Sequence, residues 1–190
     1  MNELPHLLCE TEADWEQWLA DNHATSQGVW LKIAKKDGGK QSVSYQEALG
    51  VGLCFGWIDG QKGKLDDAYF LQKFTPRRKN SRWSLINRDK VTVLIEQGKM
   101  HAAGLREVEA AQADGRWDAA YASQSQITVP DDLQAALDAN ESAKAFFAQL
   151  NSVNRYAILY RIQNVKKAET RTRKIAEFVQ MLADNKQIYP

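Results

Sequence analysis

Cysteine and histidine are scarce in this chain, and neither falls in a metal-binding or redox spacing. The two cysteines, Cys9 and Cys54, form no CxxC pair, and the three histidines, His6, His23 and His101, lie far apart in sequence. Zinc sites and dithiol redox sites need close, regular spacings of these residues. The sequence therefore predicts no metal site, and Cys54, which lies in an apolar run, is expected to be a buried thiol.

Motifs for nucleotide cofactors and for hydrolases are also absent. No GxGxxG follows a predicted strand, and neither GxxxxGK[ST] nor GxSxG occurs in the sequence. We therefore predict no cofactor. Ser–His–Asp and Cys–His arrangements stay open because such groups assemble in space. Cys54 with His101 is the only thiol–imidazole pair that we consider.

Long apolar runs are missing as well. No segment approaches the roughly 18 apolar residues that span a bilayer, and the N-terminus has no basic segment followed by an apolar one, as an export leader would. These absences predict a cytoplasmic protein. The chain has 190 residues, of which 44% are hydrophobic and 26% charged, which suits one domain or two small ones.

Acidic and basic residues are separated along the chain, and the small net charge of +1 hides this separation. Residues 1–24 hold six acids and no Lys or Arg, residues 73–90 hold seven cations and one acid, and residues 151–174 hold seven cations and one acid. A nearly neutral total gives no global attraction to nucleic acid or membrane. The two basic segments are local candidates for contact with an anion.

The pattern of apolar residues predicts an α+β protein. Helical spacing favours helices over 11–24, 44–56, 81–99 and 101–117, whereas alternation or β-branched and aromatic content favours strands over 28–36, 57–60 and 67–75. We expect a small antiparallel sheet packed with helices in a domain of residues 1–122. After a polar linker, residues 129–190 are expected to form a three-helix unit, with helices over 130–150, 151–165 and 168–186.

Several blocks of the sequence resemble a known bacterial family. They include "LCFGWIDGQ", "FTPRRKNSRWSLIN", "VPDDLQAALDAN" and "NRYAILYRIQNVKKAETRTRKIAEFVQML". In this order and spacing the chain is similar to the YdeI/OmpD-associated family, also labelled bacteriocin-protection proteins, over residues 12–187. The family name attaches to the part from about 129 to 187. The resemblance supports the fold and implies a role in stress or bacteriocin protection. The resemblance implies no catalytic residue. Some members are described as periplasmic, but this sequence shows no export signal.

The segment "CFGWIDG" holds the first candidate binding residues. Trp57 and Asp59 are two apart, so in a strand they lie on the same face. An aromatic ring beside a carboxylate suits an amine, a sugar or the edge of a base. The alternative is structural, with Trp57 in the core and Asp59–Gly60 in a turn.

The segment "TPRRKNSRW" holds the strongest candidate site. Asn80 or Ser81 can cap the following helix, whose N-terminal N–H groups attract anions, and arginine guanidinium groups bind phosphate or carboxylate in a bidentate manner. Trp83 could stack on a ring or on an arginine. The alternative is a solvated loop, or cations paired with acids such as Asp66 and Asp67. The predicted ligand-binding set is Trp57, Asp59, Arg77, Arg78, Arg82, Trp83 and Asn87.

Three functions fit these observations. The first is a non-catalytic binding protein for a small anionic ligand or an anionic partner. The second is a protein that binds RNA or DNA through the basic segments and exposed aromatic residues. The third is an enzyme that uses Asp59 and the cluster from Arg77 to Arg82, although no activated nucleophile is visible. The first is our prediction; the ligand, the partner and the oligomeric state are not encoded in any motif.

Overall fold

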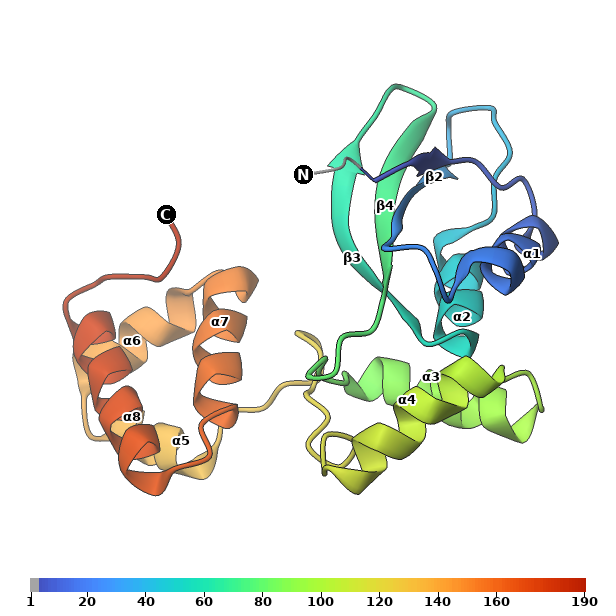
Figure 1. Ribbon diagram of the computed structural model, residues 1–190. Coiled ribbons are helices and arrows are strands. Elements are labelled where there is room, and N and C mark those ends of the chain that lie inside the picture. Colours follow the sequence, from blue (N-terminus) through green and yellow to red (C-terminus); the bar gives the residue numbers. More distant parts are fainter. Residues whose placement is uncertain (1–3) are drawn as a thin grey trace. The chain divides into compact units, whose positions relative to one another are not determined.

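A computed structural model describes residues 4–190 of the chain. In this range the chain forms four strands and eight helices, and it divides into two compact units, one extending to Ala120 and one from Tyr121 to Pro190 (Figure 1). The prediction of an α+β protein is confirmed.

The N-terminal unit is built on a four-stranded sheet with the strand order β1-β2-β4-β3. Its strands are β1 (His6–Leu7), β2 (Val29–Ala34), β3 (Trp57–Lys64) and β4 (Tyr69–Pro76). The pairs β2–β4 and β3–β4 are antiparallel, as expected, but β1 runs parallel to β2, so the sheet is mixed. The prediction of a wholly antiparallel sheet missed β1, because two residues carry no readable alternation.

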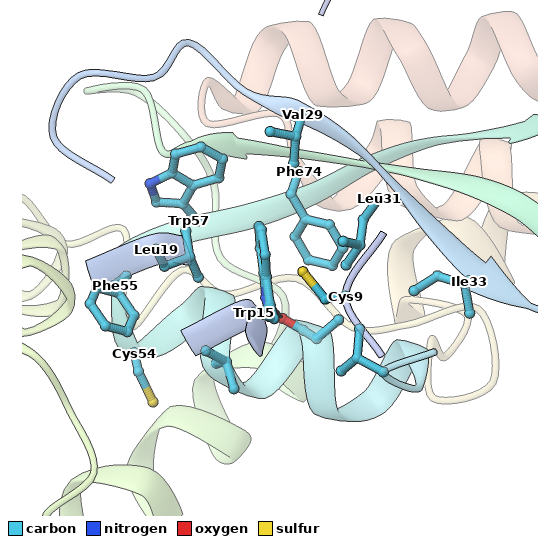
Figure 2. Close-up of a cluster of buried hydrophobic side chains, with 13 residues drawn as sticks. Cys9, Trp15, Leu19, Val29, Leu31, Ile33, Cys54, Phe55, Trp57 and Phe74 are labelled. Atoms are coloured by element: carbon cyan, nitrogen blue, oxygen red, sulfur yellow. Dashed lines mark hydrogen bonds between the residues drawn. The ribbon is translucent and has the colours of Figure 1, made fainter. Parts of the chain in front are cut away.

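Helices α1 (Glu12–Asn22) and α2 (Tyr45–Cys54) cover one face of this sheet (Figure 1). Figure 2 shows the core between them, where Trp15 of α1 lies near Phe74 of β4 and Trp57 of β3. All three side chains are at most 1% exposed. The buried indole of Trp15 donates its N–H to the Ala48 carbonyl of α2 at 3.0 Å, which satisfies a polar group that would otherwise be costly to bury.

Helices α3 (Leu85–Glu96) and α4 (Ala102–Ala113) form a second cluster against α2. The buried side chains of this cluster are Leu49, Leu53, Trp83, Val91, Val108 and Ala111. The His101 N–H donates to the Cys54 carbonyl at 3.0 Å, so the start of α4 is tied to the end of α2.

Local capping explains where these helices begin. Thr11 and Ser44 each form the capping box that fixes the first turns of α1 and α2, and the box at Ser44 and Glu47 was predicted. Helix α3 begins later than expected, because the Ser84 hydroxyl accepts from the Asn87 N–H at 3.2 Å. Asn80 and Ser81 therefore lie in the loop before α3 and do not cap it.

The C-terminal unit contains four helices where three were predicted. They are α5 (Asp131–Asp138), α6 (Glu141–Gln149), α7 (Ser152–Gln163) and α8 (Ala168–Ala183). The single helix expected over 130–150 is divided, because the Asn140 side chain accepts from the Ala143 N–H at 3.0 Å and starts a new helix. Among residues 4–190, no helix has the length and apolar character that crossing a bilayer requires.

Candidate functional site

The junction between α2 and β3 places Arg77 beside Trp57. Helix α2 ends at Cys54, and Gly56 turns the chain into β3 with a φ of 74°, a value that favours glycine. A Cβ atom at Gly56 would lie 3.0 Å from the Ala103 carbonyl oxygen of α4, so a larger residue would also crowd that helix. The Arg77 N–H donates to the Gly56 carbonyl at 3.0 Å and extends the β3–β4 pairing by one residue.

A hollow of about 300 Å³ lies at this junction. Its lining includes His23 from the end of α1, Phe55 and Trp57 around the turn, Arg77 after β4, and Arg106 and Glu107 from α4. We call it the Arg77 hollow. Its lining includes two arginines, one glutamate and three aromatic residues.

Arg77 is held in place by stacking. Its side chain is 7% exposed, its guanidinium carbon lies 3.6 Å from the ring centroid of Trp83, and Nη1 donates to the Arg82 carbonyl at 3.3 Å. A desolvated cation–π contact of this kind contributes about 2 kcal/mol. Trp83 is itself 1% exposed and contacts Trp117 edge-on at 4.9 Å. The guanidinium is therefore fixed before any ligand arrives.

Three aromatic rings cluster beside the hollow, and two of them, His23 and Phe55, line it. His23, Phe55 and His101 lie with ring centroids 4.7 to 5.3 Å apart. The Trp57 indole N–H donates to the His23 carbonyl at 3.3 Å, which ties this cluster to the sheet. The fold thus joins two histidines that are distant in sequence. Within residues 4–190, no group of three or more His, Cys, Asp or Glu side chains is placed to hold a metal ion.

The candidate residues from the sequence divide between the hollow and its surroundings. Trp57 and Arg77 line the hollow, and the Trp83 ring stacks on the guanidinium of Arg77. Because Trp57 and Trp83 are each 1% exposed, neither offers a free ring face for stacking on a ligand. Arg78 and Arg82 are exposed and lie outside the lining.

Asp59 and Asn87 also lie outside the Arg77 hollow. The Asp59 carboxylate accepts the Tyr45 hydroxyl at 2.8 Å, so it faces α2. Burial, together with this hydrogen bond, raises the pKa of Tyr45. Asn87 is 8% exposed within α3. Asp59 is therefore joined to α2, and neither residue extends the group around Arg77.

His23, Arg106 and Glu107 line the hollow and were not among the candidates from the sequence. Arg106 and Glu107 stand in a helix of mixed polarity, and His23 follows the acidic first helix. No local motif marks any of the three. The packing of α4 against the α2–β3 turn brings Arg106 and Glu107 to Arg77, and the end of α1 brings His23.

The thiol considered with His101 is not poised for nucleophilic chemistry. Burial, with a smaller effect of the Glu16 carboxylate, raises the pKa of the Cys54 thiol to about 11. A thiol must ionise to act as a nucleophile, and at neutral pH this one stays protonated. The contact between Cys54 and His101 is a backbone hydrogen bond.

The geometry suits recognition of an anion. Guanidinium groups give strong, charge-assisted hydrogen bonds to carboxylate and phosphate oxygens. Arg77 is fixed by the fold, whereas Arg106 is exposed on α4 and can adjust to a ligand. Glu107 supplies an opposite charge within the same lining and limits the total positive charge.

Comparison with protein families gives two matches. Residues 7–107 match the family described as Domain of unknown function (DUF8412), and residues 126–185 match the family described as Bacteriocin-protection, YdeI or OmpD-Associated. Neither curated proteins nor solved structures gave a match. The second match confirms the resemblance found in the sequence. The chain therefore belongs to the DUF8412 family through its N-terminal unit and carries a YdeI/OmpD-associated domain in its C-terminal unit.

Proposed function

We propose that this protein is a non-catalytic binding protein that recognises a small phosphate or carboxylate in the Arg77 hollow. The observation that carries this proposal is the convergence of Arg77, Arg106 and His23 on one hollow, with Arg77 already fixed over Trp83. A fixed guanidinium loses little conformational entropy when it binds, so its hydrogen bonds convert more fully into affinity.

The volume of the Arg77 hollow limits the class of ligand that it can hold. A volume of about 300 Å³ lies at the small end of ligand pockets, which run from roughly 300 to 1,000 Å³. A small anion, or the anionic group of a larger molecule, fits this space better than a whole dinucleotide. The description of the C-terminal family names bacteriocin protection, and we propose that any protective role of this chain operates through binding.

Calorimetry on single-residue variants tests the proposal. Inorganic phosphate, pyrophosphate and small dicarboxylates are titrated into the wild type and into Arg106→Ala at about 0.15 M salt, where remote charges are screened. Because a hydrogen bond to a charged group is worth about 1.5 to 3 kcal/mol, we expect Arg106→Ala to weaken binding roughly 10- to 150-fold. Glu107→Gln removes a negative charge that repels the anion, so it should strengthen anion binding.

Arg78→Ala is the matched control. Arg78 is one residue from Arg77, is exposed and lies outside the lining, so its removal changes the net charge equally without touching the hollow. We expect Arg78→Ala to retain the wild-type affinity within about twofold. Equal losses in Arg78→Ala and Arg106→Ala, or no binding of any of these anions to the wild type, would refute the proposal.

A further inference from the structure

The sheet has a second face that no helix of the N-terminal unit covers. In β2, Val29, Leu31 and Ile33 point into the core (Figure 2), so the alternating residues between and after them point the other way. The register of β2 with β4 then sets the opposing residues of this face. We call it the outer face; it comprises Trp30, Lys32, Ala34, Tyr69, Leu71 and Lys73.

The indole ring of Trp30 extends across the outer face. Trp30 stands on β2, yet its ring reaches to 3.6 Å from the position that a Cβ atom of Gly63 would take on β3, two strands away. It thereby passes over β4 and shields Leu71, which is 7% exposed although no helix of the N-terminal unit covers it. Trp30 is partly exposed, consistent with a face open to stacking.

Cations and a second ring complete the outer face. Lys73 pairs with Trp30 across the strands, and its Nζ lies 5.8 Å from the ring centroid. Tyr69 pairs with Ala34, four residues along β2 from Trp30, which corresponds to roughly 13 Å along the strand. Two rings at this separation contact two different planar groups of a ligand.

The same strands end in a basic hollow. It has a volume of about 880 Å³ and includes Ala34 in its lining, so it adjoins the outer face. Four ammonium groups also line it, those of Lys35, Lys36, Lys62 and Lys64. Across residues 4–190, none of these four forms an ion pair within 4.0 Å. Lys35 donates to the Asp66 carbonyl at 2.6 Å, and Lys62 lies 3.9 Å from the Phe70 ring centroid.

Acidic residues do not neutralise this hollow. Asp66 and Asp67 also line it, but an Asp66 carboxylate oxygen already accepts the N–H groups of Ala68 and Tyr69, at 2.8 and 2.7 Å. Four cations against two acids leave the hollow positive. Clustered ammonium groups repel one another, and an extended polyanion relieves that repulsion.

We propose that the outer face and the adjoining basic hollow bind single-stranded nucleic acid. Bases stack on aromatic side chains only where they are not already stacked in a duplex, and lysines bind successive phosphates without regard to sequence. The rings offer stacking on the outer face, and the basic hollow meets that face at Ala34 and Gly63. Lys62 and Lys64 pair with Gln72 and Phe70 of the opposite face, so a bound strand reaches these lysines by crossing the end of the sheet. This surface shares no residue with the Arg77 hollow. The proposal of single-strand binding can therefore be tested independently of the proposal of anion binding.

The test is a titration of a fluorescent single strand of about 15 nucleotides, a length that covers one binding unit of this kind. The proteins are the full chain, Trp30→Ala, Trp30→Phe and a variant with Lys35, Lys36, Lys62 and Lys64 all changed to Ala. We expect Trp30→Ala to weaken binding roughly 5- to 150-fold, the range for loss of one base–ring stack, and Trp30→Phe to restore most of it. Circular dichroism verifies that each variant is folded.

Salt dependence separates the phosphate contacts from the stacking. Each neutralised phosphate of a single strand adds about 0.7 to the slope of log K against log salt. The four-lysine variant should therefore lower the slope by about 2 to 3, whereas Trp30→Ala should leave it unchanged. The matched control replaces four other exposed lysines, Lys79, Lys99, Lys166 and Lys167, and should retain the affinity and slope.

Three results would overturn the proposal. The first is no binding of the single strand at low salt. The second is equal loss in the control variant, which would assign the contact to general charge or to the C-terminal basic segment. The third is binding of duplex DNA or of vesicles containing anionic lipid as tightly as the single strand with the same dependence on Trp30, which would identify a different partner.

Discussion

At the scale of single residues, two glycines within helices have opposite surroundings. A Cβ atom at Gly104 of α4 would overlap the Cys54 carbonyl oxygen, whereas a Cβ atom at Gly50 of α2 would meet nothing within 4 Å. Gly104 therefore allows α4 to approach the end of α2, and this approach forms one wall of the Arg77 hollow. Gly50 has no comparable packing role in the described part of the chain.

The same substitution at these two positions should change stability in opposite directions. We expect Gly104→Ala to lower the free energy of unfolding by roughly 3 kcal/mol, because backbone must move to make room. Gly50→Ala should raise it by about 1 kcal/mol, the difference in helix propensity between glycine and alanine. Urea unfolding followed by circular dichroism measures both. Similar effects of the two substitutions would show that the packing of α4 against α2 is not as described.

At the scale of the elements, one arginine joins three helices of the C-terminal unit. Arg171 of α8 donates from Nε and Nη2 to the two carboxylate oxygens of Asp132 of α5, at 2.6 and 2.9 Å. Its Nη1 donates to the Ile162 carbonyl near the end of α7 at 2.8 Å. The hydrogen bonds from Arg171 hold the pKa of Asp132 below its ordinary value. The pair is partly exposed, so solvent screens it.

This arrangement predicts a stability that depends on pH. Because the folded-state pKa of Asp132 is lowered, its contribution is present at neutral pH and is lost as the pH falls through that pKa. Asp132→Asn should cost about 0.5 to 1 kcal/mol at neutral pH, and the difference from wild type should shrink in acid. Thermal unfolding between neutral and acid pH measures this difference.

Asp131→Asn is the control for that prediction. Asp131 shares the first turn of α5 and has the same charge, but it forms none of the ion pairs found in residues 4–190. Its replacement reports the effect of the helix dipole alone. An equal, pH-dependent loss in both variants would mean that Arg171 adds nothing specific.

Elements with strong local signals could be predicted from sequence, and those without them could not. The alternation of Val29, Leu31 and Ile33 indicated β2, and the capping box at Ser44 indicated α2, because both signals are local. The two-residue β1 exists only through its pairing with β2, and the break before Asn140 depends on one side-chain hydrogen bond. Neither leaves a periodic pattern.

In the candidate site, too, residues with a local sequence signal could be predicted and residues without one could not. Arg77 stood out in a segment dense in cations, and Trp57 stood out because it shares a predicted strand face with Asp59. Their neighbours His23 and Arg106 come from helices that are distant in sequence, so no spacing could reveal them. Sequence also could not show that Trp83 is buried beneath Arg77, since a tryptophan near arginines has the same pattern whether it is exposed or buried.

At the scale of the whole molecule, each compact unit has its own core. In the C-terminal unit, ten buried side chains form one cluster, including Leu133, Phe147, Ile158 and Phe178. We propose that a fragment of residues 121–190 folds on its own. It should show helical circular dichroism and a cooperative thermal transition, although a unit of this size is expected to be only marginally stable.

Two substitutions in the fragment make this prediction specific. Ile158→Ala leaves a cavity at a fully buried position and should cost about 2 to 5 kcal/mol, enough to unfold a marginal domain. Val153→Ala on the same helix, where the side chain is 55% exposed, should leave the transition nearly unchanged. A fragment without a cooperative transition, or one indifferent to Ile158→Ala, would show that this unit needs the rest of the chain.

The central claim is that a small anion binds between Arg77 and Arg106. The most direct measurement is a nuclear magnetic resonance titration of inorganic phosphate that follows the Nε–H signals of the arginines in the full-length protein. We predict saturable chemical-shift changes for the Nε–H signals of Arg77 and Arg106 and for the Trp57 indole N–H. The Arg78 signal should stay unchanged. Shifts that fail to saturate, or that appear equally at Arg78, would contradict it.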